Sequence, residues 1–314
     1  MKAIVVTDRA AGTAGMKLLE RPEPEAARLA SLAGANYGDV VVEVHASGFT
    51  GNELEWPSTW IDRLGRDRTP SIPGHEVAGV VTALSYGTTG LSVGQRVFGL
   101  TDWTRDGTLA EYAVVEARNL EPLAGDVDFR VAAGVAMTGL TAWQGLFDHG
   151  RLRAGQSVLV HGAAGAVGSM ATQLAREAGA YIIGTGRAAG RQTALDFGAH
   201  EFIDLDNETL EDIGGVDLVF DVIGGHIQRR SAGVVRAGGT LVTVTGPPEA
   251  RPADGLAIDF VVMSDRAQLS EIAQRVRDGR VRTNIGQVAP LDDAVAAFNP
   301  TEPVKGKTII SVRP

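Results

Sequence analysis

Cysteine is absent from this chain of 314 residues. Its absence excludes disulfide bonds, thiol catalysis and any metal site that depends on a thiolate ligand. Long hydrophobic runs are absent too, since none approaches the ~18 apolar residues of a membrane-spanning helix. The apolar run near the N-terminus ends before Asp8 and is too short for a signal peptide. We therefore expect a protein of the cytoplasm with no membrane partner.

Positive charge is in short supply. The 29 Lys and Arg residues are outnumbered by 38 Asp and Glu residues, which gives a formal net charge of −9. Proteins that bind nucleic acid or anionic membranes usually carry the opposite sign, so we expect neither partner. Hydrophobic residues make up 44% of the chain and glycine occupies 40 positions. This composition is typical of an α/β enzyme that is large enough for two domains.

The most informative segment is Ser157–Gly168. An apolar stretch typical of a buried strand leads into a glycine-rich turn, after which apolar residues recur with helical spacing. Glycines let the backbone approach a pyrophosphate closely, and a helix N-terminus offers free N–H groups with a partial positive charge. The segment therefore predicts a phosphate site of a dinucleotide, with these candidate residues: Gly162, Gly165, Ala166, Val167 and Gly168.

A second strand, Tyr181–Gly184, follows, and the residues beyond it bear on which dinucleotide binds. An acid there would bond the ribose 2′-hydroxyl of NAD, whereas an Arg would accommodate the 2′-phosphate of NADP. This chain has no acid before Asp196 and offers Gly186, Arg187 and Arg191 instead. The sequence therefore favours NADPH. The alternative is that both arginines are ordinary solvated loop cations.

Two further strands are predicted at Val216–Ile223 and Gly239–Gly246. Strands that alternate with helical spacers form a parallel sheet with right-handed crossovers, and ligands bind beyond the carboxyl ends of such strands. Four residues at these ends are therefore expected near the cofactor: Val222, Ile223, Thr245 and Gly246. The alternative is that they only form the turns that end the strands.

The first 120 residues have a different pattern. Short strands separated by turns that contain Gly and Pro indicate a β-rich barrel or sandwich, at Val40–Val44, Val77–Val81 and Gln95–Leu100. Near the C-terminus we expect helices at Ala267–Val276 and Asp292–Phe298 and strands at Val281–Val288 and Thr308–Val312. We predict a β-rich domain over residues 1–125, a nucleotide-binding domain over 126–262 and a return of residues 263–314 to the first domain.

Four segments, taken in order, resemble one family: Pro73–Val81, Val93–Gly99, Met137–Trp143 and the glycine-rich turn. The chain is similar to the zinc-independent branch of the medium-chain dehydrogenase/reductase superfamily, the quinone oxidoreductase and enoyl reductase group. The resemblance implies an α/β fold made of a GroES-like catalytic domain and a Rossmann domain with a doubly wound parallel sheet. It also implies an NADPH-filled cleft between the two domains.

The same resemblance implies further contacts. The segment Lys305–Ile310 looks like the family's last strand, and Lys307 within it is expected to bind the cofactor. Thr138 is expected to contact the nicotinamide side. Members of the family are usually homodimers that pair through the last Rossmann strand, which here would lie around Phe260–Val262.

Zinc-using relatives require a cysteine or similar ligand early in the chain, a His in the Gly-His-Glu motif, and a further Cys or acid. Only His75 and Glu76 are present here, and a catalytic zinc needs three converging protein ligands. We interpret His75 as a hydrogen-bonded turn residue and expect no zinc.

Without a Lewis acid, a plain ketone is harder to reduce than an enone or a quinone, in which the negative charge is delocalised. Relatives often place an Asn after the early loop and a Tyr further on, but this chain has Phe49 and Thr50 there. Thr50 and Asn52 are our candidates for polarising a carbonyl. No Tyr is evident as proton donor, so we expect solvent to protonate the enolate.

Trp56, Trp60 and Trp103 either wall a pocket that accepts an aromatic ring or pack at a domain edge. The leading hypothesis is an NADPH-dependent reductase of quinones or enones. One alternative is an enoyl-thioester reductase of polyketide or fatty-acid synthesis, which a basic patch would favour. Others are a non-catalytic NADPH-binding sensor and a zinc alcohol dehydrogenase, which the missing ligands disfavour.

Overall fold

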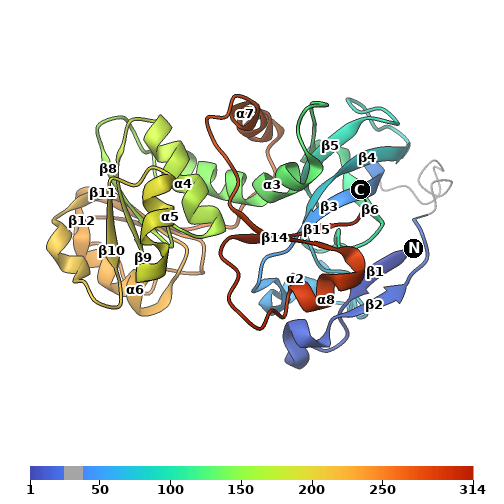
Figure 1. Ribbon diagram of the computed structural model, residues 1–314, viewed down its shortest axis with the longest axis horizontal. Coiled ribbons are helices and arrows are strands. Elements are labelled where there is room, and N and C mark those ends of the chain that lie inside the picture. Colours follow the sequence, from blue (N-terminus) through green and yellow to red (C-terminus); the bar gives the residue numbers. More distant parts are fainter. Residues whose placement is uncertain (25–37, 314) are drawn as a thin grey trace. The chain divides into compact units, whose positions relative to one another are not determined.

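The computed structural model describes residues 1–24 and 38–313, which divide into two compact units (Figure 1). Unit 1 comprises Met1–Met137, Ser264–Ala273 and Ile285–Pro314, and unit 2 comprises Thr138–Met263 and Gln274–Asn284. The chain therefore leaves unit 1, forms most of unit 2 and returns. Two helices, α3 (Phe129–Trp143) and α7 (Arg266–Arg277), each contribute residues to both units. The α/β class is confirmed.

Unit 1 is built on a mainly antiparallel sheet in which valines of the inner face form the core. The strand order is β14-β15-β3-β4-β5-β7. Strand β6 lies outside this order and pairs with β3 along Asp39–Glu43. The sheet strands are β3 (Asp39–Gly48), β4 (Glu76–Leu84), β5 (Arg96–Leu100), β6 (Tyr112–Glu116), β7 (Leu120–Pro122), β14 (Ile285–Pro290) and β15 (Lys307–Ser311). A hairpin and two short helices complete the unit: β1 (Lys2–Val5), β2 (Lys17–Glu20), α2 (Pro57–Trp60) and α8 (Ala294–Ala297).

Unit 2 contains a parallel sheet of six strands in the order β10-β9-β8-β11-β12-β13. The direction of strand succession reverses between β8 and β11, and ligands of doubly wound sheets bind at such a reversal. The strands are β8 (Ser157–His161), β9 (Tyr181–Gly186), β10 (Glu201–Asp204), β11 (Val216–Asp221), β12 (Val235–Thr243) and β13 (Gly255–Asp259). Helices α4 (Ala166–Glu177) and α5 (Arg191–Asp196) pack against β8, β9 and β10, and α6 (Gly225–Ser231) packs against β12 (Figure 1).

Three predicted strands end earlier than their sequence pattern indicates. Strand β11 ends at Asp221 because that carboxylate accepts the N–H groups of Ile223 and Gly224 at 3.0 Å each and so closes a turn. Strand β12 ends at Thr243, and β13 is paired with it residue for residue, so β13 ends with it at Asp259. The expected position of the last Rossmann strand, around Phe260–Val262, was therefore wrong by a few residues.

The segment that precedes β14 also differs from expectation. The predicted strand Val281–Val288 begins only at Ile285, because the preceding residues are bound to unit 2. There the backbone N–H and C=O of Arg282 bond the side chain of Gln173 at 2.9 Å each. The predicted helix Asp292–Phe298 is a 3₁₀ turn followed by the short helix α8. In the described part of the chain, no helix is long and apolar enough to cross a membrane.

Candidate functional site

The glycine-rich turn of unit 2 has the geometry of a phosphate cradle. Gly162 follows β8 with a φ of 65°, and Gly165 is the N-cap of α4. A Cβ on Gly168 would lie 2.1 Å from the carbonyl oxygen of Gly162, so the helix could not approach the turn if that residue carried a side chain. The first turn of α4, which starts at Ala166 and Val167, presents N–H groups that have no acceptor inside the helix.

The predicted residues of the neighbouring strands gather at the same edge of the sheet. A Cβ built on Gly162 would lie 3.0 Å from Val222 Cγ2 and 3.8 Å from Ile223 Cγ1, so both side chains stand beside the turn. Thr245 follows β12, and its Oγ1 would lie 2.6 Å from a Cβ on Gly224. The sheet edge at the reversal between β8 and β11 thus carries predicted residues from three strands, and Gly246 directly follows Thr245.

Two polar contacts that the sequence did not indicate hold this edge in place. The Nδ2 of Asn284 donates to the carbonyl oxygen of Ala164 within the turn at 2.9 Å. His161 is fully buried and bonds Thr185 Oγ1 through Nδ1 at 2.7 Å and Ser231 Oγ through Nε2 at 2.6 Å. Burial lowers the pKa of His161 to about 4, and the nearby carboxylate of Asp221 opposes that shift. The imidazole is therefore neutral near pH 7 and acts as a hydrogen-bonding bridge.

The two arginines proposed for the 2′-phosphate differ in their surroundings. Arg187 follows β9, is exposed, and its guanidinium has no ion pair or hydrogen bond to any described residue. Arg191 is already engaged: its Nη1 donates to the carbonyl oxygen of Phe202 at 2.7 Å and its Nη2 to Glu208 Oε2 at 2.7 Å. Arg187 is thus available for an anionic ligand, whereas Arg191 would first have to give up Glu208.

Unit 1 contains a buried charged cluster that the sequence pattern did not bring together. Lys307 Nζ lies 2.5 Å from Glu76 Oε2, and the two side chains are 6% and 0% exposed. Glu76 Oε1 accepts the N–H of Met137 at 3.2 Å. Burial raises the pKa of Glu76, and the ammonium of Lys307 opposes that shift. Lys307, predicted to contact the cofactor, is here the counter-ion of Glu76, so its cofactor contact remains a prediction.

A second buried pair lies next to the first. His75 Nδ1 is 2.7 Å from Glu53 Oε1, which also accepts the N–H of Gly74 at 2.5 Å. The hydrogen bond agrees with the interpretation of His75 as a bonded turn residue, although its partner lies 22 residues away. The side chains are 2% exposed for His75 and 0% for Glu53. No short motif relates the two positions, so the pattern alone held no signal for this pair.

The predicted catalytic candidates lie around these pairs. Thr50 is half-buried, its Oγ1 donates to the sulfur of Met137 at 3.3 Å, and its N–H donates to Glu53 Oε2 at 3.4 Å. Asn52 is exposed and caps the turn Glu53–Glu55 without a side-chain hydrogen bond to it. Thr138 follows Met137 in α3 and is 3% exposed. The first two therefore lie in unit 1, and Thr138 is the first residue of unit 2.

The tryptophans separate into two kinds. Trp60 belongs to a hydrophobic core and its Nε1 donates to the carbonyl oxygen of Leu54 at 2.7 Å, so its role is packing. Trp56 and Trp103 are partly exposed and meet edge-on with ring centroids 5.4 Å apart. Their rings flank the imidazole of His75 at centroid distances of 6.1 Å and 4.9 Å.

The donor set of unit 1 does not fit a catalytic zinc. Glu76 is paired with Lys307, and His75 has its Nδ1 occupied by Glu53. Residues 1–24 and 38–313 hold no group of three or more His, Asp or Glu side chains arranged to bind a metal ion.

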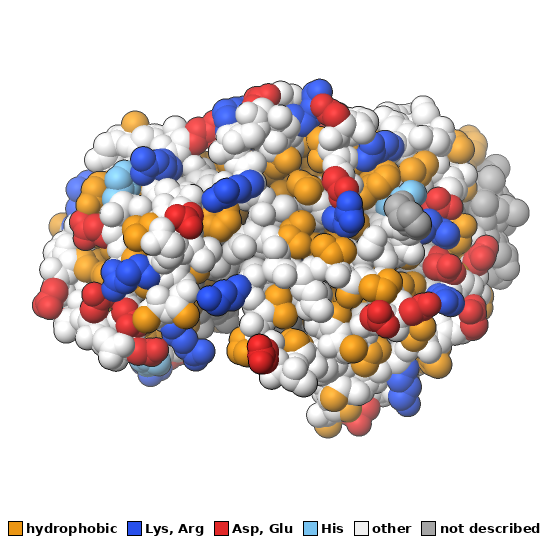
Figure 2. Space-filling view, viewed as in Figure 1, with side chains coloured by type: hydrophobic (Ala, Val, Ile, Leu, Met, Phe, Trp, Pro, Cys, Tyr) orange, Lys and Arg blue, Asp and Glu red, His pale blue; other side chains and the backbone are white. Residues whose placement is uncertain are grey.

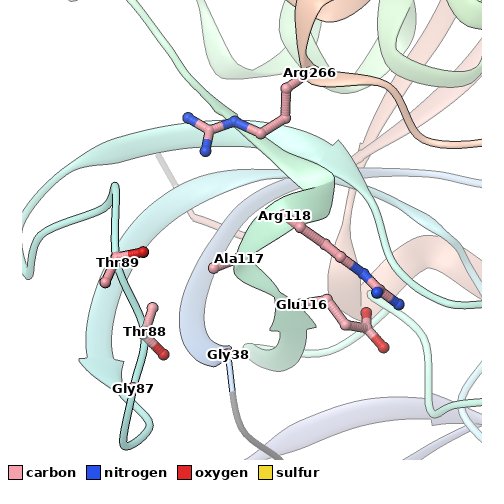
Figure 3. A pocket seen from close by; sticks show the side chains of 8 residues that line it. All are labelled: Gly38, Gly87, Thr88, Thr89, Glu116, Ala117, Arg118 and Arg266. Carbon is pink, nitrogen blue, oxygen red and sulfur yellow. The ribbon is translucent and has the colours of Figure 1, made fainter.

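A surface pocket in unit 1 lies apart from these pairs, between the turn at Gly87 and the start of α7 (Figure 3). Its charged lining is partly neutralised. Glu116 Oε1 accepts from Arg105 at 2.8 Å, and Arg266 lies 3.4 Å from Glu121. We assign it no chemistry.

Two family models match the chain. The model for the alcohol dehydrogenase GroES-like domain matches residues 36–125, and the model for zinc-binding dehydrogenases matches residues 197–310. The quinone oxidoreductase of Mus musculus is 31% identical over 294 residues, covering 86% of this chain and 87% of the mouse protein. The spectinabilin polyketide synthase system protein NorB of Streptomyces orinoci is 33% identical over 318 residues, covering 95% of this chain and 14% of that protein.

The crystal structure of Escherichia coli quinone oxidoreductase complexed with NADPH superposes with a TM-score of 0.84. The match covers 99% of this chain and 100% of that chain at 22% identity. At this level of identity the likeness establishes the fold alone.

We expect Lys307→Met to destabilise the protein by about 3–5 kcal/mol near pH 7, because it leaves the carboxylate of Glu76 buried without its counter-ion. Since burial raises the pKa of Glu76, this carboxyl takes up a proton as the pH falls, and the loss should shrink toward acidic pH. Urea unfolding at several pH values measures both effects.

The matched control is Lys305→Met, two residues earlier in the chain and exposed, which should change stability by less than about 0.5 kcal/mol. The double variant Lys307→Met/Glu76→Gln should regain part of the loss, because it no longer buries a charge. Equal losses in both single variants would contradict a stabilising role for the pair.

Proposed function

The chain belongs to the quinone oxidoreductase group of the medium-chain dehydrogenase/reductase superfamily and is an oxidoreductase, and we propose that it is an NADPH-dependent reductase of quinones or activated C=C bonds that works without zinc. The observation that carries this proposal is the glycine cradle at the reversal between β8 and β11. Only glycine at position 168 permits the contact of helix and turn, and the resulting concavity suits a pyrophosphate.

The proposed preference for NADPH over NADH rests on Arg187. Arg187 directly follows β9, the strand whose end lies near the adenosine ribose in dinucleotide-binding sheets. Its guanidinium has no ion pair or hydrogen bond to the described residues. A second cation, Arg191, lies four residues on but is held by Glu208. The name of the Escherichia coli structure with the same fold also mentions NADPH. An Asp or Glu after β9 would repel a 2′-phosphate, and the sequence has neither between Tyr181 and Asp196.

NADPH, when bound, supplies the hydride. Unit 2 binds it through the N–H groups of the first turn of α4, with Val222 and Ile223 as apolar neighbours of the turn. Unit 1 supplies the polar groups for the acceptor, for which Thr50 and Asn52 are our candidates. The protein therefore orients the reactants and stabilises the negative charge that develops on the acceptor oxygen, as expected for a reaction whose electrons come from the cofactor.

The choice of acceptor follows from what unit 1 lacks. Glu76 is paired with Lys307, Glu53 is bonded to His75 Nδ1, and the chain has no thiolate, so these residues provide no Lewis-acid site for a plain carbonyl. An enone or a quinone needs less, because conjugation spreads the developing charge and a few hydrogen-bond donors suffice.

An enoyl-thioester reductase is the second candidate. The match to the NorB protein, at 33% identity over 95% of this chain, favours it. A carrier-bound or coenzyme A thioester brings phosphate groups that a basic surface would hold. On the face drawn in Figure 2, however, Lys and Arg side chains are interspersed with acidic ones, and the chain carries a net charge of −9. The charge distribution thus favours the uncharged acceptors.

We also propose a homodimer that pairs through β13, at the edge of the unit 2 sheet. The outer edge of β13 has no strand partner among the described residues, and its neighbourhood exposes Leu256 at 60%, Val261 at 70% and Met263 at 65%. An exposed apolar edge strand is prone to pair with another chain, and a second copy offers the same edge.

The function is tested by following NADPH oxidation with one quinone, one enone and one enoyl thioester, with and without a chelator. We expect turnover of the quinone and the enone that survives chelation. Turnover of the thioester alone would favour the second candidate. NADPH binding without turnover of any acceptor would contradict a reductase and favour a sensor.

We expect Arg187→Ala to raise the KM for NADPH about tenfold to a hundredfold, because one charge-assisted hydrogen bond is worth about 1.5–3 kcal/mol. The KM for NADH should stay within a factor of about two, since NADH has no 2′-phosphate. Arg153→Ala removes another exposed arginine of unit 2 and is the control for general charge effects. Equal changes with both cofactors would remove Arg187 from the site.

For the dimer, we expect Val261→Asp to convert a species of two chains into one of a single chain, because it places a charge at the paired edge. Light scattering coupled to size exclusion measures the mass. Val93→Asp is the matched control, since Val93 is 62% exposed in unit 1. A wild-type monomer, or a Val261→Asp variant that stays dimeric, would contradict the proposal.

A further inference from the structure

We propose that His75, held by the buried carboxylate of Glu53, is the proton donor of the reductase: its Nε2 gives a proton to the acceptor that receives the hydride. The inference rests on the proposed function and assigns to His75 a step for which the sequence pattern indicated only solvent.

His75 Nε2 is buried and has no hydrogen-bond partner in the part of the chain that the structure describes. A buried polar atom left without a partner carries an uncompensated desolvation cost, so native proteins rarely keep one without a reason. The other imidazole nitrogen, Nδ1, is hydrogen-bonded to Glu53, so the two nitrogens of the same ring differ in having a partner.

The partner of Nδ1 fixes the state of the ring. Glu53 Oε1 lies 2.7 Å from His75 Nδ1, and an ionised carboxylate only accepts hydrogen bonds, so Nδ1 carries the proton. The remaining lone pair or proton of the ring is therefore at Nε2. His–carboxylate pairs with this hydrogen bond exchange protons in general acid–base catalysis.

Glu53 is itself held firmly. Its Oε1 accepts the N–H of Gly74 at 2.5 Å, and its Oε2 accepts the N–H of Thr50 at 3.4 Å. The side chain is fully buried, so it cannot swing away to solvent. Two backbone N–H groups, one of them from the candidate residue Thr50, thus hold the carboxylate against the imidazole.

The surroundings of His75 are aromatic and suit a planar acceptor. The indole rings of Trp56 and Trp103 flank the imidazole, and both are partly exposed. Neither ring offers Nε2 a hydrogen bond in this structure. The two indoles contact each other edge-on beside the imidazole. A conjugated ring that packs against their exposed parts would bring a polar atom to Nε2 and exclude water from it, and general acids work best in such a site.

The acceptor receives a hydride at its β-carbon, where a new C–H bond forms, and the electrons of the C=C bond move to give an enolate. The Nε2–H bond of the imidazolium then breaks, its electron pair stays on Nε2, and the proton forms a C–H bond at the α-carbon. The acceptor is reduced by two electrons and NADPH is oxidised to NADP⁺. Water returns a proton to Nε2.

Assays with two acceptors, an enone and a quinone, distinguish a proton-donating role of His75 from a purely structural one. Protonation of an enolate at carbon is slow without a positioned acid, whereas the hydroquinone anion formed from a quinone is a weak base that solvent protonates readily. We therefore expect His75→Gln to lower kcat/KM for an enone by about a hundredfold or more, and for a quinone by less than about tenfold. The control is His200→Gln, which alters an exposed histidine of unit 2 that directly precedes β10.

A second readout is stereochemical. In D₂O, the wild type should deliver deuterium to one face of an enone that is substituted at its α-carbon, and His75→Gln should deliver it to both faces because solvent takes over. Glu53→Gln removes the carboxylate that accepts from His75 Nδ1 and should show the same preference for impairing the enone. Thermal melting of each variant reports whether the fold is retained.

Equal losses with the enone and the quinone in His75→Gln, or retention of single-face deuteration, would overturn the assignment and leave His75 a structural residue. Failure of the wild type to reduce either acceptor would instead overturn the reductase function itself, and the proton donor with it. The two failures are therefore distinguishable in the same set of assays.

Discussion

The ion pair between Lys307 and Glu76 joins the C-terminal strand β15 to the interior of unit 1. Gly48 of β3 makes room for it, because a Cβ there would lie 2.4 Å from Glu76 Oε2 and 2.9 Å from Lys307 Cε. Glu76 in turn accepts the N–H of Met137, the last residue of the long first segment of unit 1. A charge buried this deeply is tolerated only with its counter-ion, so the pairing constrains three chain segments at once and fixes where α3 leaves the unit.

The Glu53–His75 pair sits one residue from Glu76 and shares its surroundings. Both acids are fully buried, yet they are satisfied differently: Glu76 by a full opposite charge, Glu53 by backbone N–H groups and an imidazole. In the second arrangement one ring nitrogen, His75 Nε2, has no hydrogen-bond partner among residues 1–24 and 38–313, and it is the atom that we propose as proton donor. In unit 2 the corresponding constraint is steric, because the contact between Gly162 and Gly168 leaves no space for a Cβ. One unit thus offers buried charge and the other a backbone cradle.

Much of unit 2 could be predicted because its signals are local. The strand, turn and helix around Gly162–Gly168 follow one another within twelve residues, and period and glycine placement specify each of them. The ends of β11 and β12 were less predictable, since the Asp221 carboxylate and the pairing of β12 with β13 decide them. Likewise, the start of β14 at Ile285 depends on the bonds of Arg282 to Gln173 across more than a hundred residues.

The sequence by itself determined the fold class, the family resemblance and the glycine-rich turn between β8 and α4, because periodicity and glycine spacing act over a few residues. The availability of Arg187 and the engagement of Arg191 by Glu208 were decided by tertiary structure. So were the pairing of Lys307 with Glu76 and the approach of Glu53 to His75. The physical reason is that the charge state and exposure of a polar side chain depend on which distant residues fold against it, and burial makes those partners obligatory.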